Sequence, residues 1–303
     1  MRARPVNDKP GGLLVPLTTP FDPDTGDVAP IHLRDNARAL LASGVDGLVA
    51  CGSTGEASLL DDDEYRCVVE WLRDVVPPDR WLIAGAGRES TRATVAACHD
   101  AASAGADAVL VRSPSYYAPV LTDGSLSRHF RRVADESPIP VFLYNMPKYT
   151  HVSLTDTLLA SLADHPNIWG IKDSSGDLKN FAAYRDAVPE WTLLVGSGAL
   201  FYAALELGAA GTIAAAGCFA AGLTAAIGVA FAAGDRGRAG AAQEKLAPLH
   251  REIVGGYGVA GIKAAVDAVG LIGGPVRPPL ADLGAGDRQR VYELLGQAGL
   301  CNT

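Results

Sequence analysis

The stretch Ser43-Gly44-Val45-Asp46-Gly47-Leu48-Val49-Ala50 carries a pattern that occurs twice more along the chain. Ala104-Gly105-Ala106-Asp107-Ala108 leads into the apolar residues 109–111, and Leu207-Gly208-Ala209-Ala210-Gly211 leads into residues 212–214. In each copy a glycine follows a helix-like segment, at the point where a left-handed C-cap is needed. A short, continuous apolar run comes next, as in a strand covered on both faces. The pattern predicts a helix followed by a strand of a parallel sheet.

Apolar runs of the same kind recur through the first 234 residues. Residues 13–16, 81–84, 141–144, 168–172 and 192–195 join the three runs above to give eight predicted strands, with helix-like segments between them. This alternation predicts an α/β fold, a closed (β/α)8 TIM barrel over residues 1–234, with an open doubly wound sheet as the alternative. Helices predicted over residues 235–254, 258–269 and 287–298 form a C-terminal helical region, residues 235–303, packed on the barrel.

Composition narrows the class of protein. The 303 residues are 48% hydrophobic and 20% charged, which allows a large buried core and excludes a disordered or collagen-like chain. A formal net charge of −8 argues against nucleic acid or an anionic membrane as a partner. Five scattered cysteines without a CxxC pair fit reduced thiols in a cytoplasmic protein, and residues 1–10 contain no readable secretory signal.

One apolar segment needs a separate test. Residues 207–234 carry no charge, but they are built largely of alanine and interrupted by glycines. Alanine and glycine insert weakly into membranes. We therefore expect a buried strand, loop and helix here rather than a membrane span.

Two reactive side chains end predicted strands, and the carboxyl ends of barrel strands line one mouth. Lys172 ends residues 168–172, where burial would lower the pKa of its amine towards neutrality, and a neutral amine can form an imine with a carbonyl carbon. The structural alternative is a salt bridge to Asp173 or Asp177. Tyr144 ends residues 141–144, and a phenol there can pass protons to and from a carbinolamine. Its alternative is a core tyrosine with a satisfied hydroxyl.

Three turns follow other predicted strands. Gly52-Ser53-Thr54-Gly55-Glu56 offers backbone amides and two hydroxyls that could hold a carboxylate or phosphate, without the lysine and spacing of a Walker A loop. Thr18-Thr19-Pro20 and the turn that ends in Tyr116-Tyr117 are ambiguous between a site and a packed loop. Gly52 and Thr19 are retained as substrate-binding candidates.

Other cofactor motifs have little support in the sequence. The six histidines form no HxH or HExxH pattern, there is no GxSxG elbow, and Gly85-Ala86-Gly87 lacks the third glycine of a dinucleotide site. The amine of Lys172, the phenol of Tyr144 and the anion-binding turn at residues 52–56 are instead the groups that imine chemistry on a 2-oxo acid requires. The protonated imine is an electron sink, so a bond at C3 can be broken or made without a metal.

The chain resembles the dihydrodipicolinate synthase / N-acetylneuraminate lyase family of class I aldolases from residue 14 to about residue 295. The resemblance rests on Gly52-Ser53-Thr54-Gly55-Glu56, Tyr144-Asn145-Met146-Pro147 and Gly170-Ile171-Lys172-Asp173, together with Gly261-Ile262-Lys263-Ala264-Ala265 and Arg277-Pro278-Pro279-Leu280. It implies a barrel with a helical C-terminal region, assembled as a homotetramer that is a dimer of dimers.

The resemblance also implies roles for particular residues. Lys172 would be the Schiff-base lysine and Tyr144 the proton-shuttling phenol. The carboxylate of pyruvate would be bound by Ser53 and Thr54, of which Ser53 also relays protons. Further positions that the resemblance implies are the pocket-lining Gly196 and Ile213 and a tyrosine lent across a tight dimer interface, Tyr117 or its neighbour Tyr116.

Departures from the family pattern bear on the substrate. The lysine-pathway synthase usually has an arginine five residues after the shuttle tyrosine, and here that residue is Tyr149. Ser53 stands where that synthase usually has threonine, and Lys172 is followed by Asp173, as in many sugar-acid and hydroxy-oxo-acid members. Arg112 and Lys148 are candidates for holding a second carboxylate.

We therefore predict a metal-independent class I aldolase or lyase, with no cofactor beyond the covalent imine. It would cleave or form a 4-hydroxy-2-oxo acid or a 2-keto-3-deoxy acid, using pyruvate or glyoxylate and an aldehyde. The alternatives are a 4-hydroxy-tetrahydrodipicolinate synthase, a sugar-acid dehydratase that uses the same imine, and a non-catalytic 2-oxo-acid binding protein.

Overall fold

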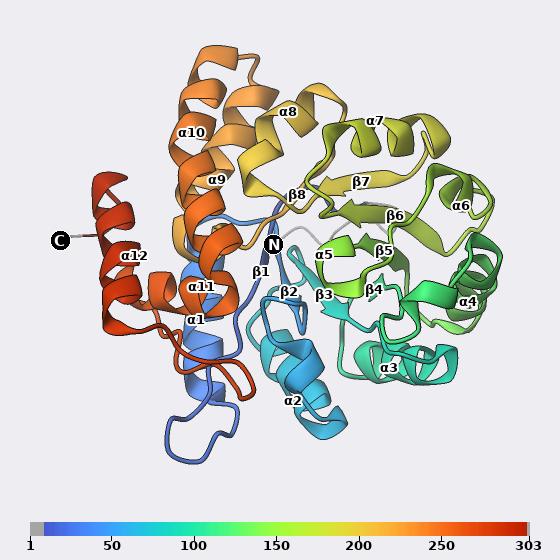
Figure 1. Cartoon of the computed structure of the whole chain (residues 1–303), viewed down its shortest axis with the longest axis horizontal. Coiled ribbons are helices and arrows are strands. Elements are labelled where there is room, and N and C mark those ends of the chain that lie inside the picture. Colours follow the sequence, from blue (N-terminus) through green and yellow to red (C-terminus); the bar gives the residue numbers. More distant parts are fainter. Residues whose placement is uncertain (1–8, 302–303) are drawn as a thin grey trace.

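The computed structural model describes residues 9–301, so most of the segment tested above for a secretory signal, residues 1–8, lies outside the described residues. Within this range eight parallel strands pair in sequence order, and the last pairs with the first to close a barrel (Figure 1). This closure confirms the predicted TIM barrel and rules out the open doubly wound sheet. The strands are β1 (Gly12–Pro16), β2 (Gly47–Ala50), β3 (Trp81–Gly85), β4 (Ala108–Arg112), β5 (Val141–Asn145), β6 (Ile168–Asp173), β7 (Thr192–Val195) and β8 (Gly211–Ile213).

Helices surround the barrel in Figure 1. The helices up to the one that follows β8 are α1 (Pro30–Ala42), α2 (Asp62–Arg73), α3 (Thr91–Ser103), α4 (Asp123–Glu136), α5 (Pro147–Thr150), α6 (Asp156–Ala160), α7 (Leu178–Ala187), α8 (Phe201–Glu206) and α9 (Gly217–Ala232). Short 3₁₀ turns η1 (Ala57–Leu59), η2 (Ala118–Val120) and η3 (Gly198–Leu200) interrupt the loops after β2, β4 and β7.

The repeated sequence pattern has a structural cause. Its glycines lie at positive φ, for example +86° at Gly44, as a left-handed helix end requires. The aspartate of the first two copies then ties neighbouring strands together. Asp46 accepts a hydrogen bond from the backbone N–H of Leu13 at 2.8 Å, and Asp107 accepts one from that of Leu82 at 2.8 Å. Each copy thus ends a helix, and the aspartate of the first two copies fixes the start of the next strand.

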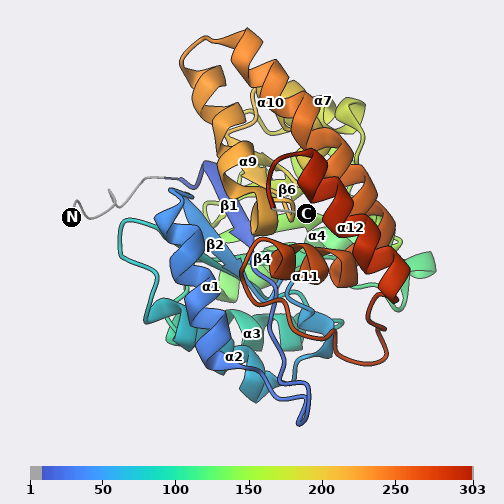
Figure 2. The ribbon, with the colours of Figure 1, turned by 90° about the vertical axis from the view of Figure 1, so that its left-hand side faces the viewer.

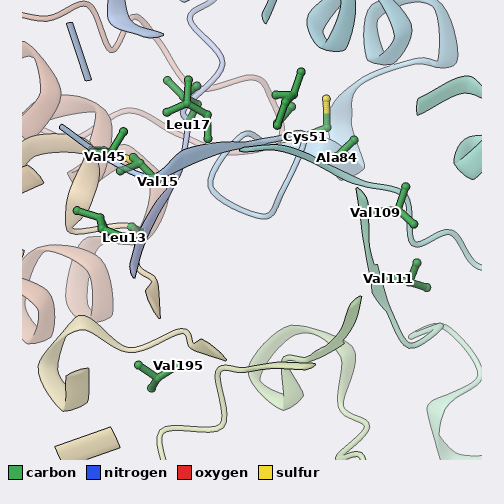
Figure 3. Close-up of a cluster of buried hydrophobic side chains, with 14 of the residues drawn as sticks. Leu13, Val15, Leu17, Val45, Cys51, Ala84, Val109, Val111 and Val195 are labelled. Atoms are coloured by element: carbon green, nitrogen blue, oxygen red, sulfur yellow. The ribbon is translucent and has the colours of Figure 1, made fainter. Parts of the chain in front are cut away.

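Side chains alternate between two cores because successive strand residues point to opposite faces. Figure 3 shows Leu13, Val15, Val109 and Val111 pointing outward from the ring of strands towards the helices. The intervening Leu14 and Leu110 belong to a separate cluster inside the barrel, together with Val49, Phe142 and Ile213. A full interior leaves only the mouths for chemistry.

The segment 207–234 forms the turn after α8, then β8 and α9. Residues 211–221 are buried as expected, whereas the outer face of α9 is exposed, with Val229 at 69%. Across residues 9–301, no helix has the length and apolar character needed to cross a membrane.

The C-terminal helices pack against α9, which in turn packs on β1, and α11 contributes to the cavity at the carboxyl-end mouth of the barrel (Figure 2). They are α10 (Arg236–Leu249), α11 (Tyr257–Ala268) and α12 (Ala285–Gln297). The helix predicted over residues 235–254 is present, but its last five residues belong to η4 (His250–Gly256), which is a π-helix. Pro248 lies just before this change and cannot donate the hydrogen bond that would continue the α-helical ladder.

Candidate active site

Lys172 and Tyr144 lie side by side at the carboxyl-end mouth. They are register partners on adjacent strands β6 and β5. The Nζ atom of Lys172 lies 4.2 Å from the centroid of the Tyr144 ring, and each residue is only 6% exposed. Neither predicted salt bridge forms. Asp173 instead accepts hydrogen bonds from Asn145 Nδ2 and Ser175 Oγ, each at 2.8 Å, and Asp177 caps α7.

The surroundings of Tyr144 favour its ionised form. Burial by itself raises the pKa of this phenol. The Lys172 ammonium and hydrogen bonds to Ser53, Ser174 and Lys172 outweigh burial, so the pKa of Tyr144 lies below its ordinary value. A phenol of this kind, in contact with an amine and two hydroxyls, is suited to moving protons.

The turn Gly52-Ser53-Thr54-Gly55-Glu56 follows β2 and brings its hydroxyls to the same place. Backbone hydrogen bonds from Gly55 N and Ala57 N to Gly52 O, at 3.1 and 3.2 Å, close the turn. Thr19 lies behind it, where its Oγ1 donates to Gly55 O at 2.7 Å. Thr19 therefore positions the turn and is absent from the lining of the cavity described next.

A cavity of about 220 Å³ brings the predicted residues together. Six of them line it: Ser53, Thr54, Tyr144, Lys172, Gly196 and Ile213. The predicted Gly52 lines a neighbouring cavity of about 600 Å³, to which Ser53 and Tyr144 also contribute. Tyr116 and Tyr117 line neither cavity. They are 79% and 67% exposed, with their rings edge to face at 5.0 Å.

The lining of the 220 Å³ cavity also contains two residues that sequence reasoning missed. His250, at the start of η4, meets Ser197 after β7, with Nε2 3.3 Å from Oγ. Burial, with the charges of Arg251 and Lys148, lowers the pKa of His250 to about 4, so the imidazole is neutral near pH 7. The adjacent Gly196 could have pointed to Ser197, but no local pattern marks His250.

The two candidate carboxylate-binding cations differ in position. Lys148 lines the 220 Å³ cavity beside Tyr149, and its Nζ donates to Gly255 O at 3.4 Å. Arg112 lines two neighbouring cavities instead, where Nη1 pairs with Glu89 at 3.0 Å. Burial raises the pKa of Glu89, but hydrogen bonds from Tyr116, Ser115 and Arg112 outweigh it and bring it to about 2.

A (β/α)8 barrel with an amine, a phenol and a hydroxyl-bearing turn at its carboxyl-end mouth has the arrangement of a (β/α)8-barrel enzyme. The profile of the dihydrodipicolinate synthetase family matches residues 9–298, and the chain belongs to this family of enzymes. Across the described residues, no group of three or more His, Cys, Asp or Glu side chains is arranged to hold a metal ion.

Individual relatives are similar over nearly the whole chain. An uncharacterised DapA-like lyase of Halobacterium salinarum is 38% identical over 95% of this chain and 94% of its own length. A 4-hydroxy-tetrahydrodipicolinate synthase of Methanoculleus marisnigri is 35% identical over 95% and 99%.

Solved structures agree with this assignment. YagE, a prophage protein of this family from E. coli K12 in complex with pyruvate, superposes with a TM-score of 0.91 at 30% identity and covers 96% of this chain and 99% of its own. The dihydrodipicolinate synthase of Acinetobacter baumannii, also complexed with pyruvate, gives the same TM-score, identity and coverage.

Proposed function

We propose that the protein is a class I aldolase or lyase in which Lys172 forms an imine with pyruvate or a related 2-oxo acid. The observation that carries this proposal is the contact of the buried Lys172 amine with the Tyr144 ring, 4.2 Å from its centroid, at the carboxyl-end mouth of the barrel. The pyruvate complexes of the YagE and Acinetobacter structures support the same oxo acid here.

In the cleavage direction, the Lys172 amine attacks C2 of the substrate to give a carbinolamine, which loses water to form a protonated imine. A base then removes the proton of the C4 hydroxyl. The C3–C4 bond breaks, the aldehyde leaves, and the electron pair moves into the imine to give an enamine. Protonation at C3 and hydrolysis release pyruvate and regenerate the amine.

The surrounding groups have separate tasks in this scheme. Tyr144 moves the protons, directly or through Ser53, because its phenol hydrogen-bonds with Ser53 and Ser174. Ser53 and Thr54 hold the substrate carboxylate at the turn after β2, on the side of the cavity next to Tyr144. A well-placed acid–base group contributes about 10²–10⁴-fold to the rate.

We propose a 4-hydroxy-2-oxo acid or a 2-keto-3-deoxy acid as the substrate. The cavity lining also includes Ser197 and a neutral His250, which suit hydroxyl groups on the departing aldehyde. Tyr149 lines the same cavity and occupies the sequence position where the lysine-pathway synthase usually has its carboxylate-binding arginine. The second candidate is 4-hydroxy-tetrahydrodipicolinate synthase, which is favoured by the 35% identical relative and by the Lys148 ammonium in this cavity.

We further propose that the enzyme works as a homotetramer in the cytoplasm. Tyr116, Tyr117 and Val120 are each at least 67% exposed beside the mouth, which is an unusual place for large apolar side chains unless a partner covers them. The five free cysteines support a reducing compartment.

Borohydride reduction in the presence of pyruvate tests the proposal. The expected result is a covalent pyruvate adduct located on Lys172 by peptide mass mapping, with none in the matched control Lys172→Arg, because a guanidinium forms no such imine. A folded wild-type protein that gives no adduct with saturating pyruvate contradicts the imine mechanism.

A retro-aldol screen with several 2-oxo acids, coupled to pyruvate detection, then identifies the substrate class. Faster turnover of pyruvate with aspartate semialdehyde than of any hydroxy-oxo acid would favour the synthase.

A further inference from the structure

Glu56, the last residue of the turn that carries Ser53 and Thr54, is a buried carboxylate whose partner comes from the far end of the chain. Its Oε1 lies 2.6 Å from Nζ of Lys263 on α11. The side chains of Glu56 and Lys263 are 0% and 2% exposed. An ion pair taken out of water this completely is seldom a net source of stability, because desolvation offsets the attraction. A contribution to stability therefore does not account for this buried ion pair.

The second carboxylate oxygen of Glu56 is also held by the C-terminal region. Oε2 accepts the backbone N–H of Arg277 at 2.8 Å. The Arg277 side chain continues the contact, donating to Leu59 O in η1 at 2.9 Å and to Glu64 Oε1 in α2 at 2.7 Å. The Phe21 ring lies 4.4 Å from Lys263 Nζ and 4.1 Å from the Arg277 guanidinium carbon. We call Glu56, Lys263 and Arg277 the clasp.

The clasp holds the backbone of Glu56 in a conformation that is unfavourable for a residue with a side chain. Glu56 has φ +57° and ψ +33°, in the left-handed region that residues with a Cβ seldom adopt. In this conformation its N–H donates to Ser53 O at 3.2 Å. The Ser53 hydroxyl in turn hydrogen-bonds with Tyr144. The position of Glu56 is thus transmitted through one turn to the phenol and hydroxyl of the cavity.

The same helix α11 also faces the cavity. Ile262, the neighbour of Lys263, lines it together with Val259. The Lys263 amine, besides meeting Glu56, donates to Pro275 O at 2.6 Å, which fixes it from the opposite side. One helix therefore both closes the cavity and holds the turn that bears Ser53 and Thr54.

We propose that the Glu56–Lys263 pair is a positioning element of the active site, which holds the turn so that Ser53 and Thr54 bind the carboxylate of the oxo acid. The inference rests on the proposed function, in which that carboxylate is bound at this turn. Neither residue touches the substrate or the reacting atoms.

The test uses two variants and a matched control. Glu56→Gln keeps the shape of the side chain and removes its charge. Glu56→Gln combined with Lys263→Met removes both charges, so that no unpaired buried charge remains. The control Arg290→Ala breaks the exposed Arg290–Glu252 pair in the same C-terminal region. Each protein is reduced with borohydride over a range of pyruvate concentrations and, separately, of acetone, a ketone without a carboxylate.

Both clasp variants are expected to need about tenfold more pyruvate for half-maximal trapping, as for loss of one hydrogen bond to a charged group. The fraction trapped at saturation should stay unchanged, as should the dependence on acetone, because Lys172 is intact. Arg290→Ala should match the wild type. Equal weakening towards pyruvate and acetone, or a folded Glu56→Gln with unaltered pyruvate dependence, overturns the inference. If wild-type protein traps neither ketone, the imine proposal itself fails.

Discussion

At the scale of single residues, the chemistry depends on how Tyr144 and Lys172 alter each other. The two side chains are register partners on the adjacent strands β5 and β6. Because both residues lie on strands rather than on loops, the amine and the phenol stay in contact. The lowered pKa of the phenol follows from this contact and from its two serine partners, against the effect of burial. A strand-borne pair of this kind is held more rigidly than one placed on loops.

Removing the phenolic oxygen tests this pairing. Tyr144→Phe keeps the ring over Lys172 and is expected to lower kcat of the retro-aldol reaction about 10²–10⁴-fold, because only the proton shuttle is lost. Steady-state assays across pH provide the measurement, with Tyr149→Phe as a control in the same cavity. A Tyr144→Phe enzyme within threefold of wild type would show that another group moves the protons.

At the scale of elements, α3 and α4 meet through a buried histidine. His129 of α4 is 7% exposed, and its Nδ1 lies 2.9 Å from Thr91 Oγ1 of α3. The charged residues that line the surface pocket around His129 are three arginines and one glutamate: Arg92, Arg128, Arg132 and Glu136. Burial lowers the pKa of His129 to about 4. The imidazole therefore stays neutral in the folded protein while the unfolded chain takes up a proton near pH 6.5.

This difference predicts a loss of stability in acid. Stability is fully present above pH 6.5 and falls as the pH drops towards 4, because the unfolded state binds the proton first. At pH 5 the loss from His129 is about 2 kcal/mol. Chemical unfolding at pH 7.5 and pH 5 should therefore show a smaller pH effect in His129→Gln than in wild type. The control His99→Gln alters an exposed residue of α3, and an equal pH effect in all three proteins would contradict the prediction.

At the scale of the whole molecule, the exposed tyrosines beside the mouth predict self-association. The wild type should sediment as a tetramer, and Tyr116→Ser combined with Tyr117→Ser should sediment as a smaller species, since the pair loses its apolar area. Ile31→Ser is the matched control, because Ile31 is 70% exposed on α1, away from this patch. Wild-type protein that sediments at the 31.4 kDa of one chain would contradict the tetramer.

A structural feature of this protein could be predicted from the sequence when it depends on neighbouring residues, and could not when it depends on residues far apart in the chain. Residues 168–172 could be predicted as a strand because β6 is buried apart from the half-buried Trp169, and this burial also marked Lys172 as an unusual amine near a strand end. The His250–Ser197 contact and the Glu56–Lys263 pair join residues far apart in the chain, and neither has a local pattern. The π-helical η4 also escaped prediction, because apolar periodicity does not distinguish it from an α-helix.

The wall that α11 and η4 contribute to the cavity has a consequence for how the enzyme is made. Chains emerge from the ribosome amino end first, and the strands β1 to β8 are complete once residue 213 has emerged. His250, Val259 and Ile262 have then not yet emerged, although each lines the cavity. A nascent barrel can thus assemble its ring of strands while its pocket stays open on one side, and it becomes competent to bind only when the last fifth of translation is under way.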